Sequence, residues 1–345
     1  MFALYRADGG KGIGMGHLFR ATCIAKQLLQ SYNIITRIIS KENEATRNFI
    51  EHSGLEHLFI SENISVDQEI NLLQEVIEEV SPLLFFLDVL EEDTNKTYVS
   101  AINQYPFTFI AITDASFYRP IEADIILNGN PNQISLDYSA ESGKYLIGPK
   151  YFIMAPEYGA TEVRKPGETV RRVLVTLGGS DHNDLMFRLI DALNHISPSL
   201  KLMLITSENT GYLPRLREYM KHQNELDYEL HADVDTLINY WSENDVAISA
   251  GGNTLFERIA TRIPGATVCQ LTRQMEIADA FEGLGVNSNI GFGPELTDDE
   301  LENGIRKFIS NRANHNNQFQ RSPDIVSGDG LILLIQEIGR KLHKN

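Results

Sequence analysis

The sequence predicts an α/β protein that is built from two doubly wound domains. The chain has 345 residues, which suits two domains of about 100–200 residues each. Short runs rich in β-branched and aromatic residues alternate with amphipathic helical patterns, as in parallel βαβ units. The alternation stops at an uneven polar join, residues 157–171, and then begins again.

The first half predicts a Rossmann-like domain over residues 1–155. The run Leu83-Leu84-Phe85-Phe86-Leu87 is continuously apolar, as expected for a strand buried on both faces of a parallel sheet. Strands are predicted at 2–6, 34–39, 83–87, 107–112 and 124–127. Helices are predicted at 17–29, 45–51, 68–80 and 97–105.

The second half predicts a similar domain over residues 170–325. Strands are predicted at 173–177, 201–205, 228–231, 246–249 and 266–270. Helices are predicted at 185–195, 213–221, 234–243, 254–261 and 277–284. The remaining segment, 326–345, contains an amphipathic helix at 331–342 that is expected to pack back on the first domain. Two such domains are expected to face a central cleft at the carboxyl ends of their strands.

Composition excludes several classes of protein. The net charge of −17 argues against nucleic-acid binding, which needs a basic surface. Cys23 and Cys269 form no metal-type cluster and fit reduced thiols of a cytoplasmic protein. The first residues reach a charge, at Arg6, too early for a signal peptide, and no apolar run approaches the ~20 residues of a membrane span. We expect no cofactor, and the oligomeric state stays open.

A glycine-rich loop follows the first predicted strand and leads into a helix that begins near His17. Residues 9–16 hold five glycines, so the backbone can approach a ligand closely with its N–H groups. The loop lacks the third glycine of a dinucleotide fingerprint and the Gly-Lys-Ser/Thr of a Walker loop. A helix N-terminus favours a neutral imidazole, which is a competent general base, although His17 could also be a simple helix cap. The glycines favour the base.

Two further glycine turns follow strands of the second half. The turn Leu177-Gly178-Gly179-Ser180-Asp181 is by itself a weak signal, because many βα turns look alike. In Ser249-Ala250-Gly251-Gly252-Asn253-Thr254, a strand runs into a helix whose first N–H groups could bind a diphosphate. Glu257, one turn into that helix, could accept both hydroxyls of a ribose, or could merely stabilise the helix dipole.

The three motifs together resemble the UDP-sugar hydrolases of pseudaminic-acid biosynthesis and the similar spore-coat polysaccharide biosynthesis proteins. Both are similar in fold to the GT-B nucleotide-sugar glycosyltransferases. The resemblance covers nearly the whole chain and is most specific at Arg6-Ala7-Asp8 and Gly14-Met15-Gly16-His17-Leu18-Phe19-Arg20. It implies hydrolysis of a UDP-linked deoxy amino sugar without an obligatory metal. UDP and the free sugar would be released for nonulosonic-acid or surface-polysaccharide synthesis.

The resemblance also implies roles for individual residues. The histidine that matches His17 would activate the attacking water. The substrate-binding residues would be Asp8, Gly14, Gly16, Arg20 and Asp88. The nucleotide-binding residues would be Gly178, Gly179, Ser180, Ala250, Gly251, Gly252, Asn253, Thr254, Glu257 and Gln274.

The chain departs from the family pattern at four places. Leu90 stands where a tyrosine is usual, Ala115 replaces an aspartate, Ala155 lies where an arginine is expected nearby, and Thr272-Arg273-Gln274 replaces acidic-Asn-Gln. Most of these positions should face the sugar, so nucleotide binding is expected to be retained while the sugar stays open. The alternatives are a GT-B glycosyltransferase with a hydroxyl acceptor and a non-catalytic sugar-nucleotide-binding protein.

Overall fold

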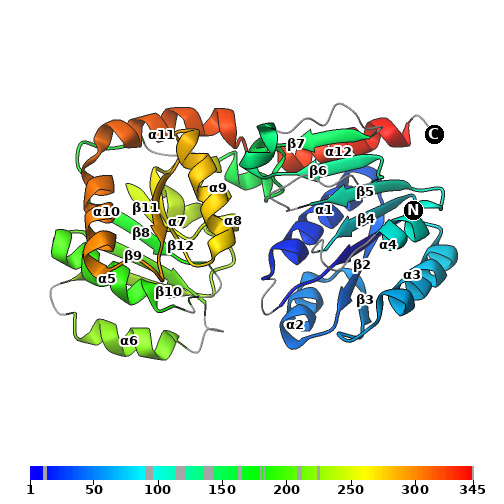
Figure 1. Ribbon diagram of the computed structural model, residues 1–345, viewed down its shortest axis with the longest axis horizontal. Helices are drawn as coiled ribbons and strands as arrows, with labels where there is room; N and C mark the ends of the chain where they lie inside the picture. The colour runs from blue at the N-terminus through cyan, green and yellow to red at the C-terminus, as the bar shows by residue number, and fades with distance from the viewer. Residues whose placement is uncertain are drawn as a thin grey trace. The chain divides into compact units, whose positions relative to one another are not determined.

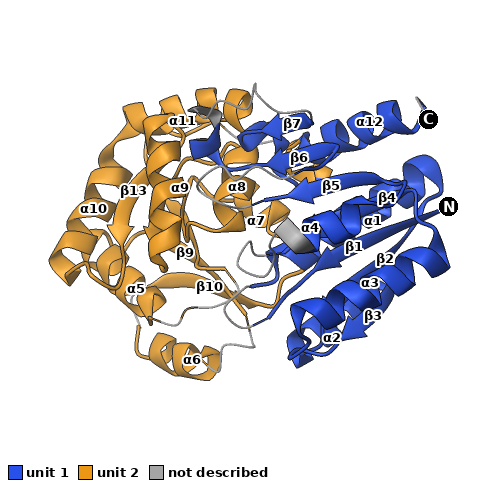
Figure 2. Ribbon diagram, turned by 45° about the vertical axis from the view of Figure 1, so that its right-hand side comes forward, with its two compact units in different colours: residues 1–155, 329–345 blue, residues 156–328 orange. Residues whose placement is uncertain are grey.

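The structure is a computed structural model whose chain divides into two compact units. Unit 1 comprises residues 1–155 and 329–345, and unit 2 comprises residues 156–328 (Figure 2). Each unit has a wholly parallel sheet flanked by helices, so the predicted α/β class with two doubly wound sheets is confirmed (Figure 1). The structure describes residues 1–10, 14–89, 96–113, 122–135, 143–161, 165–178, 181, 183–207, 212–223 and 226–343.

The sheet of unit 1 has the strand order β3-β2-β1-β4-β5-β6-β7. The strands are β1 (Phe2–Ala7), β2 (Ile35–Lys41), β3 (Glu56–Ile60), β4 (Leu84–Asp88), β5 (Thr108–Ile112), β6 (Ile125–Asn128) and β7 (Lys144–Ile147). The helices are α1 (Gly16–Tyr32), α2 (Glu44–Ser53), α3 (Val66–Val80), α4 (Lys96–Asn103) and α12 (Gly330–Leu342). The order reverses between β1 and β4, which is the point where doubly wound sheets bind ligands.

Alternate residues of each strand face opposite sides of this sheet, so unit 1 has two apolar layers. Ala3 and Tyr5 of β1 pack with α1 and α12, whereas Leu4 between them packs with α3 and α4. This arrangement explains why the strand sequences are apolar without alternation. Both faces of the sheet are covered by helices.

Helix α12 ends the chain and belongs to unit 1 (Figure 2). Leu331, Leu334, Ile335 and Ile338 of α12 are buried in the same apolar cluster as α1. The hydroxyl of Tyr32 donates a hydrogen bond of 3.2 Å to the carbonyl oxygen of Ile335. The chain therefore crosses between the units twice, after residue 155 and after residue 328.

The sheet of unit 2 has the strand order β10-β9-β8-β11-β12-β13, which reverses between β8 and β11. The strands are β8 (Arg172–Thr176), β9 (Lys201–Thr206), β10 (Asp227–Ala232), β11 (Val246–Ser249), β12 (Gly265–Cys269) and β13 (Ser288–Phe292). The helices are α5 (Leu185–Ile196), α6 (Leu213–Lys221), α7 (Ile238–Ser242), α8 (Asn253–Ala260), α9 (Thr272–Gly283), α10 (Asp298–Ser310) and α11 (Arg312–Ile325).

Several elements differ from the sequence-based expectation. Strands β3, β7 and β13 and helices α10 and α11 were not predicted. Helix α10 had a usable signal, since Thr297 and Glu300 form a capping box at its start. Helix α7 begins only at Ile238 rather than at residue 234, after Asp233 adopts a left-handed conformation with φ of 48°.

Candidate functional site

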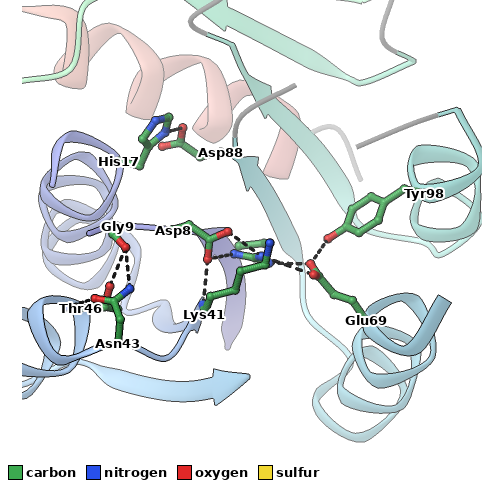
Figure 3. Close-up of polar contacts among 10 residues, drawn as sticks. Asp8, Gly9, His17, Lys41, Asn43, Thr46, Glu69, Asp88 and Tyr98 are labelled. Carbon is green, nitrogen blue, oxygen red and sulfur yellow. Dashed lines mark hydrogen bonds and ion pairs between the residues drawn. The ribbon is translucent and has the colours of Figure 1, made fainter. Parts of the chain in front are cut away.

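In unit 1, the predicted site residues gather at the carboxyl ends of β1 and β4. Asp8 follows β1 directly, Asp88 is the last residue of β4, and His17 lies in the first turn of α1. Figure 3 shows His17 and Asp88 turned toward each other, with Asp8 in a separate group of polar contacts. The tertiary fold therefore brings together residues that are up to 80 positions apart in sequence.

The glycine loop is closed on itself and fastened to α2. The backbone of Gly10 donates to the carbonyl of Gly14 at 3.1 Å, and Gly14 donates back at 2.8 Å. Their φ values of 120° and 84° are ones that favour glycine. The Nδ2 atom of Asn43 and the hydroxyl of Thr46 both donate to the carbonyl of Gly9, at 2.8 and 3.0 Å (Figure 3). Gly14, at the described end of the loop, is exposed.

The imidazole of His17 is held by the buried carboxylate of Asp88. The distance between His17 Nδ1 and Asp88 Oδ1 is 2.7 Å. Arg20 Nε and the Tyr5 hydroxyl donate to Asp88 Oδ2 at 2.8 and 2.7 Å, and Arg20 Nη2 also contacts Oδ1. Burial alone would raise the pKa of the Asp88 carboxyl, but the Arg20 guanidinium and the His17 ring hold this pKa well below its usual range.

This geometry assigns the proton on the His17 ring. An ionised carboxylate can only accept hydrogen bonds, so Nδ1 of His17 must carry the proton that bonds to Asp88. In the neutral ring, Nε2 is then the nitrogen with the lone pair. A ring that is oriented by a carboxylate through one nitrogen and accepts a proton at the other is suited to general-base chemistry.

Asp88 and Arg20, which the resemblance implies bind substrate, both lie beside His17 in the structure. The side chain of Asp88 is fully buried, with three protein side chains on its two oxygens. Arg20 is 7% exposed and spans Asp88 and the His17 ring, with 3.2 Å between its Nη2 and Nδ1 of His17. Their direct contact with a substrate stays a prediction, and the observed contacts orient the His17 ring.

Asp8 is likewise occupied by protein partners. Its carboxylate accepts two hydrogen bonds from Arg6, at 2.6 and 2.8 Å, and one from the backbone N–H of Lys41 at 2.8 Å. The other side of the Arg6 guanidinium donates to Glu69 at 2.7 Å, and Tyr98 donates to Glu69 at 2.8 Å. Asp8 is only 2% exposed. This network anchors the start of the glycine loop, and the expected contact of Asp8 with a substrate stays a prediction.

In unit 2, the two predicted glycine turns lie side by side. Strands β8 and β11 pair directly, and the backbone of Ala250 donates to the carbonyl of Thr176 at 3.2 Å. Gly178 has a φ of 78° and open space where a side chain would project. Gly179 and Ser180 lie outside the described residues. The weaker of the two sequence motifs thus adjoins the stronger one at the point where the strand order reverses.

The N-terminus of α8 is open. Gly252 is its N-cap residue and offers no side chain to cap the helix, and Asn253 is exposed. Uncapped N–H groups at a helix start can bind the oxygens of an anion. A side chain at Gly251 would lie 2.8 Å from Cβ of Gln274, so only glycine fits there without displacing α9.

Gln274 approaches the same turn from α9. Its Oε1 accepts hydrogen bonds from the backbone N–H groups of Gln270 and Leu271, at 2.8 and 3.3 Å, and so caps its own helix. That arrangement leaves Nε2 facing Gly252, 3.8 Å from the point a Cβ would occupy there. Gln274 thus offers a hydrogen-bond donor beside the open start of α8.

Glu257 sits on α8 in surroundings that disfavour its charge. Burial raises the pKa of Glu257 to about 7, and a hydrogen bond with the Tyr158 hydroxyl partly opposes this shift. Tyr158 is 4% exposed, and its hydroxyl oxygen accepts a hydrogen bond of 3.5 Å from the backbone N–H of Leu237. Tyr158 lies in the polar join, where nothing in the sequence marks it as part of the site.

A polar pocket of about 530 Å³ lies at the carboxyl end of β10 and was not predicted. It is lined by residues 230–236, 239 and 240. The hydroxyl of Tyr158 also interacts with Thr236 in this lining and therefore links the pocket to Glu257. The sequence gives no sign of this pocket, because residues 234–237 fit the pattern of a helix that begins only after them.

Two further expectations concern metal binding and membrane spans. Among the described residues, no cluster of three or more His, Cys, Asp or Glu side chains could bind a metal ion. No helix in the described part of the chain has both the length and the apolar character to cross a membrane.

Of the four departures from the family pattern, Leu90 and Ala115 lie outside the described residues, and Thr272 and Arg273 are exposed at the start of α9.

Comparison with known sequences finds distant relatives. No family model matches the chain. It is 25% identical over 332 residues to the spore coat polysaccharide biosynthesis protein SpsG of Bacillus subtilis (strain 168), covering 94% of each chain. It is 24% identical over 284 residues to the uncharacterized protein MJ1062 of Methanocaldococcus jannaschii, covering 79% of this chain but only 57% of that protein. The predicted similarity to spore-coat polysaccharide biosynthesis proteins is confirmed.

Comparison with solved structures identifies the fold. MurG of Acinetobacter baumannii matches with a TM-score of 0.70 at 11% identity, over 98% of this chain and 100% of that one. UDP-GlcNAc 2-epimerase of Neisseria meningitidis, bound to UDP-GlcNAc, matches over both full chains with a TM-score of 0.66 at 12% identity. The calicheamicin glycosyltransferase CalG4 matches with a TM-score of 0.66 at 11% identity, over 99% and 98% of the two chains. The chain has the α/β fold of GT-B glycosyltransferases, as predicted.

Proposed function

We propose that the protein binds a UDP-activated sugar and transfers the sugar to a hydroxyl acceptor, with His17 as the general base. The observation that carries this proposal is the 2.7 Å contact between His17 Nδ1 and the ionised carboxylate of Asp88. In the neutral ring, this contact places the proton on Nδ1 and the lone pair on Nε2. A positioned base of this kind contributes typically about 10²–10⁴ in rate.

The proposed reaction is a displacement at the anomeric carbon. Nε2 of His17 takes the proton of the acceptor O–H group. At the same time, the oxygen of that group forms a bond to the anomeric carbon. The bond between the carbon and the diphosphate oxygen breaks, and UDP leaves with the electron pair. Charge that develops on the leaving diphosphate would be stabilised by the N–H groups at the start of α8, an electrostatic contribution that can reach several kcal/mol.

Unit 2 supplies the proposed nucleotide site. The turns at Gly178 and at residues 250–254, with Nε2 of Gln274 beside them, would bind the diphosphate. Glu257 would accept the ribose hydroxyls, and the 530 Å³ pocket at residues 230–240 would take the base. Tyr158 interacts both with Glu257 and with Thr236 of the pocket lining. This supports the placement, because the base and the ribose of a nucleoside must bind at adjacent sites.

The comparisons support the transferase over the hydrolase. CalG4, which has the same fold, is a glycosyltransferase, and the epimerase of the same fold from Neisseria meningitidis is bound to UDP-GlcNAc. Hydrolysis of a UDP-linked deoxy amino sugar is the second candidate. It is favoured by Gly14-Met15-Gly16-His17 with Arg20, the element that resembles the pseudaminic-acid hydrolases. The same base would serve both reactions, because water only replaces the acceptor hydroxyl.

One experiment separates the candidates. The protein is incubated with a panel of UDP-sugars, including deoxy amino sugars, in ¹⁸O-labelled water, with and without a mixture of sugar and lipid acceptors. UDP release that requires an acceptor, without label in the sugar, supports the transferase. UDP release without acceptor, with ¹⁸O in the anomeric hydroxyl, supports the hydrolase. Tight UDP binding with no release under any condition would favour a non-catalytic binding protein.

A further inference from the structure

We infer that Arg20 sets the protonation state of His17: its guanidinium offsets the charge of Asp88, so that the ring stays neutral near pH 7. Arg20 acts on the charge of the ring, and only the effect of this charge on turnover rests on the proposed function, in which neutral His17 is the base.

The geometry places one cation against both partners. Arg20 Nε donates to Asp88 Oδ2 at 2.8 Å, Arg20 Nη2 contacts Oδ1, and the same Nη2 lies 3.2 Å from Nδ1 of His17. The three residues are at most 8% exposed. Water therefore screens these charges poorly, and their interactions are stronger than those of surface ion pairs.

A carboxylate at 2.7 Å from an imidazole would by itself stabilise imidazolium, since an opposite charge within hydrogen-bond distance favours the charged form. A charged ring has no lone pair and cannot act as a base. The guanidinium has the opposite effect, because it repels a second positive charge next to it. The N-terminus of α1 acts in the same direction as Arg20.

The groups that face His17 come from three elements in the described part of the chain. Asp88 comes from β4 and Arg20 from α1. Tyr5 comes from β1 and reaches the pair through Asp88 Oδ2, to which it donates at 2.7 Å. Burial raises the pKa of Tyr5, so this hydroxyl stays neutral and adds no charge. Arg20 is thus the cation that balances the carboxylate among these neighbours.

The test is an NMR titration of the His17 ring in the full-length protein without substrate. The His17 resonance is assigned by its absence in His17→Asn. In Arg20→Gln, the carboxylate is left uncompensated, and we expect the titration midpoint of His17 to move up by about one to three pH units. Arg20→Lys keeps the charge and should keep the midpoint near that of the wild type.

A double variant separates the effect of charge on the His17 midpoint from the effect of altered local structure. In Arg20→Gln combined with Asp88→Asn, both charges are gone, so the midpoint should return toward the wild-type value even if the local packing is altered. Thermal unfolding shows which variants are folded. An unchanged midpoint in folded Arg20→Gln would overturn the inference, and so would an equal upward shift in the double variant.

Turnover distinguishes this inference from the proposed function. If His17 is the base, the pH–rate profile of Arg20→Gln should lose activity at neutral pH and recover it at higher pH, whereas simple misplacement of the ring would lower the rate at every pH. If His17→Asn retains turnover, the proposed function fails. The NMR midpoints still decide whether Arg20 controls the ring.

Discussion

The hydroxyl of Tyr158 interacts with the carboxyl of Glu257 and links the polar join to the proposed nucleotide site within unit 2. The same hydroxyl oxygen accepts the backbone N–H of Leu237 beside the polar pocket. Burial raises the pKa of Glu257 to about 7, so the free protein holds this group near half ionisation at neutral pH.

We therefore expect UDP affinity to depend on pH through Glu257. Ribose hydroxyls donate to a carboxylate but not equally to a neutral acid, so binding should favour the ionised form. With a pKa of about 7, affinity should be nearly constant above pH 8 and fall roughly tenfold per pH unit below pH 6. Calorimetry between pH 5.5 and 8.5, roughly one to two pH units on each side of that pKa, measures this dependence of UDP affinity on pH.

The control is Glu257→Gln, which cannot ionise. The terminal phosphate of UDP itself titrates near pH 6, and the Gln variant isolates that contribution. Glu257→Ala should weaken binding by roughly 1–3 kcal/mol, the usual cost of unpaired buried hydroxyls. Unchanged UDP affinity in both variants would remove Glu257 from the ribose role.

Gly251→Ala should damage nucleotide binding more than its size suggests. Its Cβ would lie 2.8 Å from Cβ of Gln274 and 3.3 Å from the sulfur of Cys269, so α9 or the glycine turn must shift. We expect UDP affinity to fall at least about tenfold, that is by about 1.4 kcal/mol. Gly283→Ala is the matched control, because a Cβ there meets nothing within 4 Å. Equal UDP affinity in the two variants would show that this turn does not bind the diphosphate.

Loss of the base should affect turnover and spare binding. His17→Asn removes the group that accepts the proton while keeping a polar side chain of similar reach. We expect kcat to fall by about 10²–10⁴. UDP affinity should stay within a few-fold, since the proposed UDP-binding residues lie in unit 2. Steady-state rates and calorimetry on the same preparation measure both. Near-normal turnover would exclude His17 as the general base.

The role of the hydrogen bond between Asn43 and the glycine loop can be tested by mutation. Asn43 caps α2 through Oδ1 and holds the Gly9 carbonyl through Nδ2 at 2.8 Å. Asn43→Ala should cost roughly 1 kcal/mol of stability, as for other N-caps, and should also lower turnover because the loop that leads to His17 loses a contact. Asn311→Ala removes the N-cap of α11 without touching the loop. Its loss of stability should be similar, with full turnover, in unfolding and rate measurements. An equal loss of turnover in both variants would contradict a specific role for Asn43.

The sequence by itself determined the α/β class and most central strands. Runs such as residues 84–87 of β4 are apolar at successive positions because helices cover both faces of a parallel sheet. Glycines at the ends of β1, β8 and β11 marked the loops correctly, because a backbone with positive φ or a close neighbour requires glycine whatever the rest of the fold does. Strand β13 was missed because its Ser-Asn-Ile-Gly-Phe sequence is only partly buried and lacks the apolar run of the central strands.

The tertiary structure alone decided what surrounds each functional side chain. Asp88 and His17 are 71 residues apart, and no local pattern could show that a buried carboxylate fixes the ring, or that Arg20 and Tyr5 hold that carboxylate. The raised pKa of Glu257 depends on burial and on Tyr158, which lies 99 positions earlier in a join without periodicity. Sequence patterns report backbone conformation and average burial, which are local. Hydrogen bonds and pKa values depend on which distant groups meet, and that follows only from how the strands are ordered in each sheet.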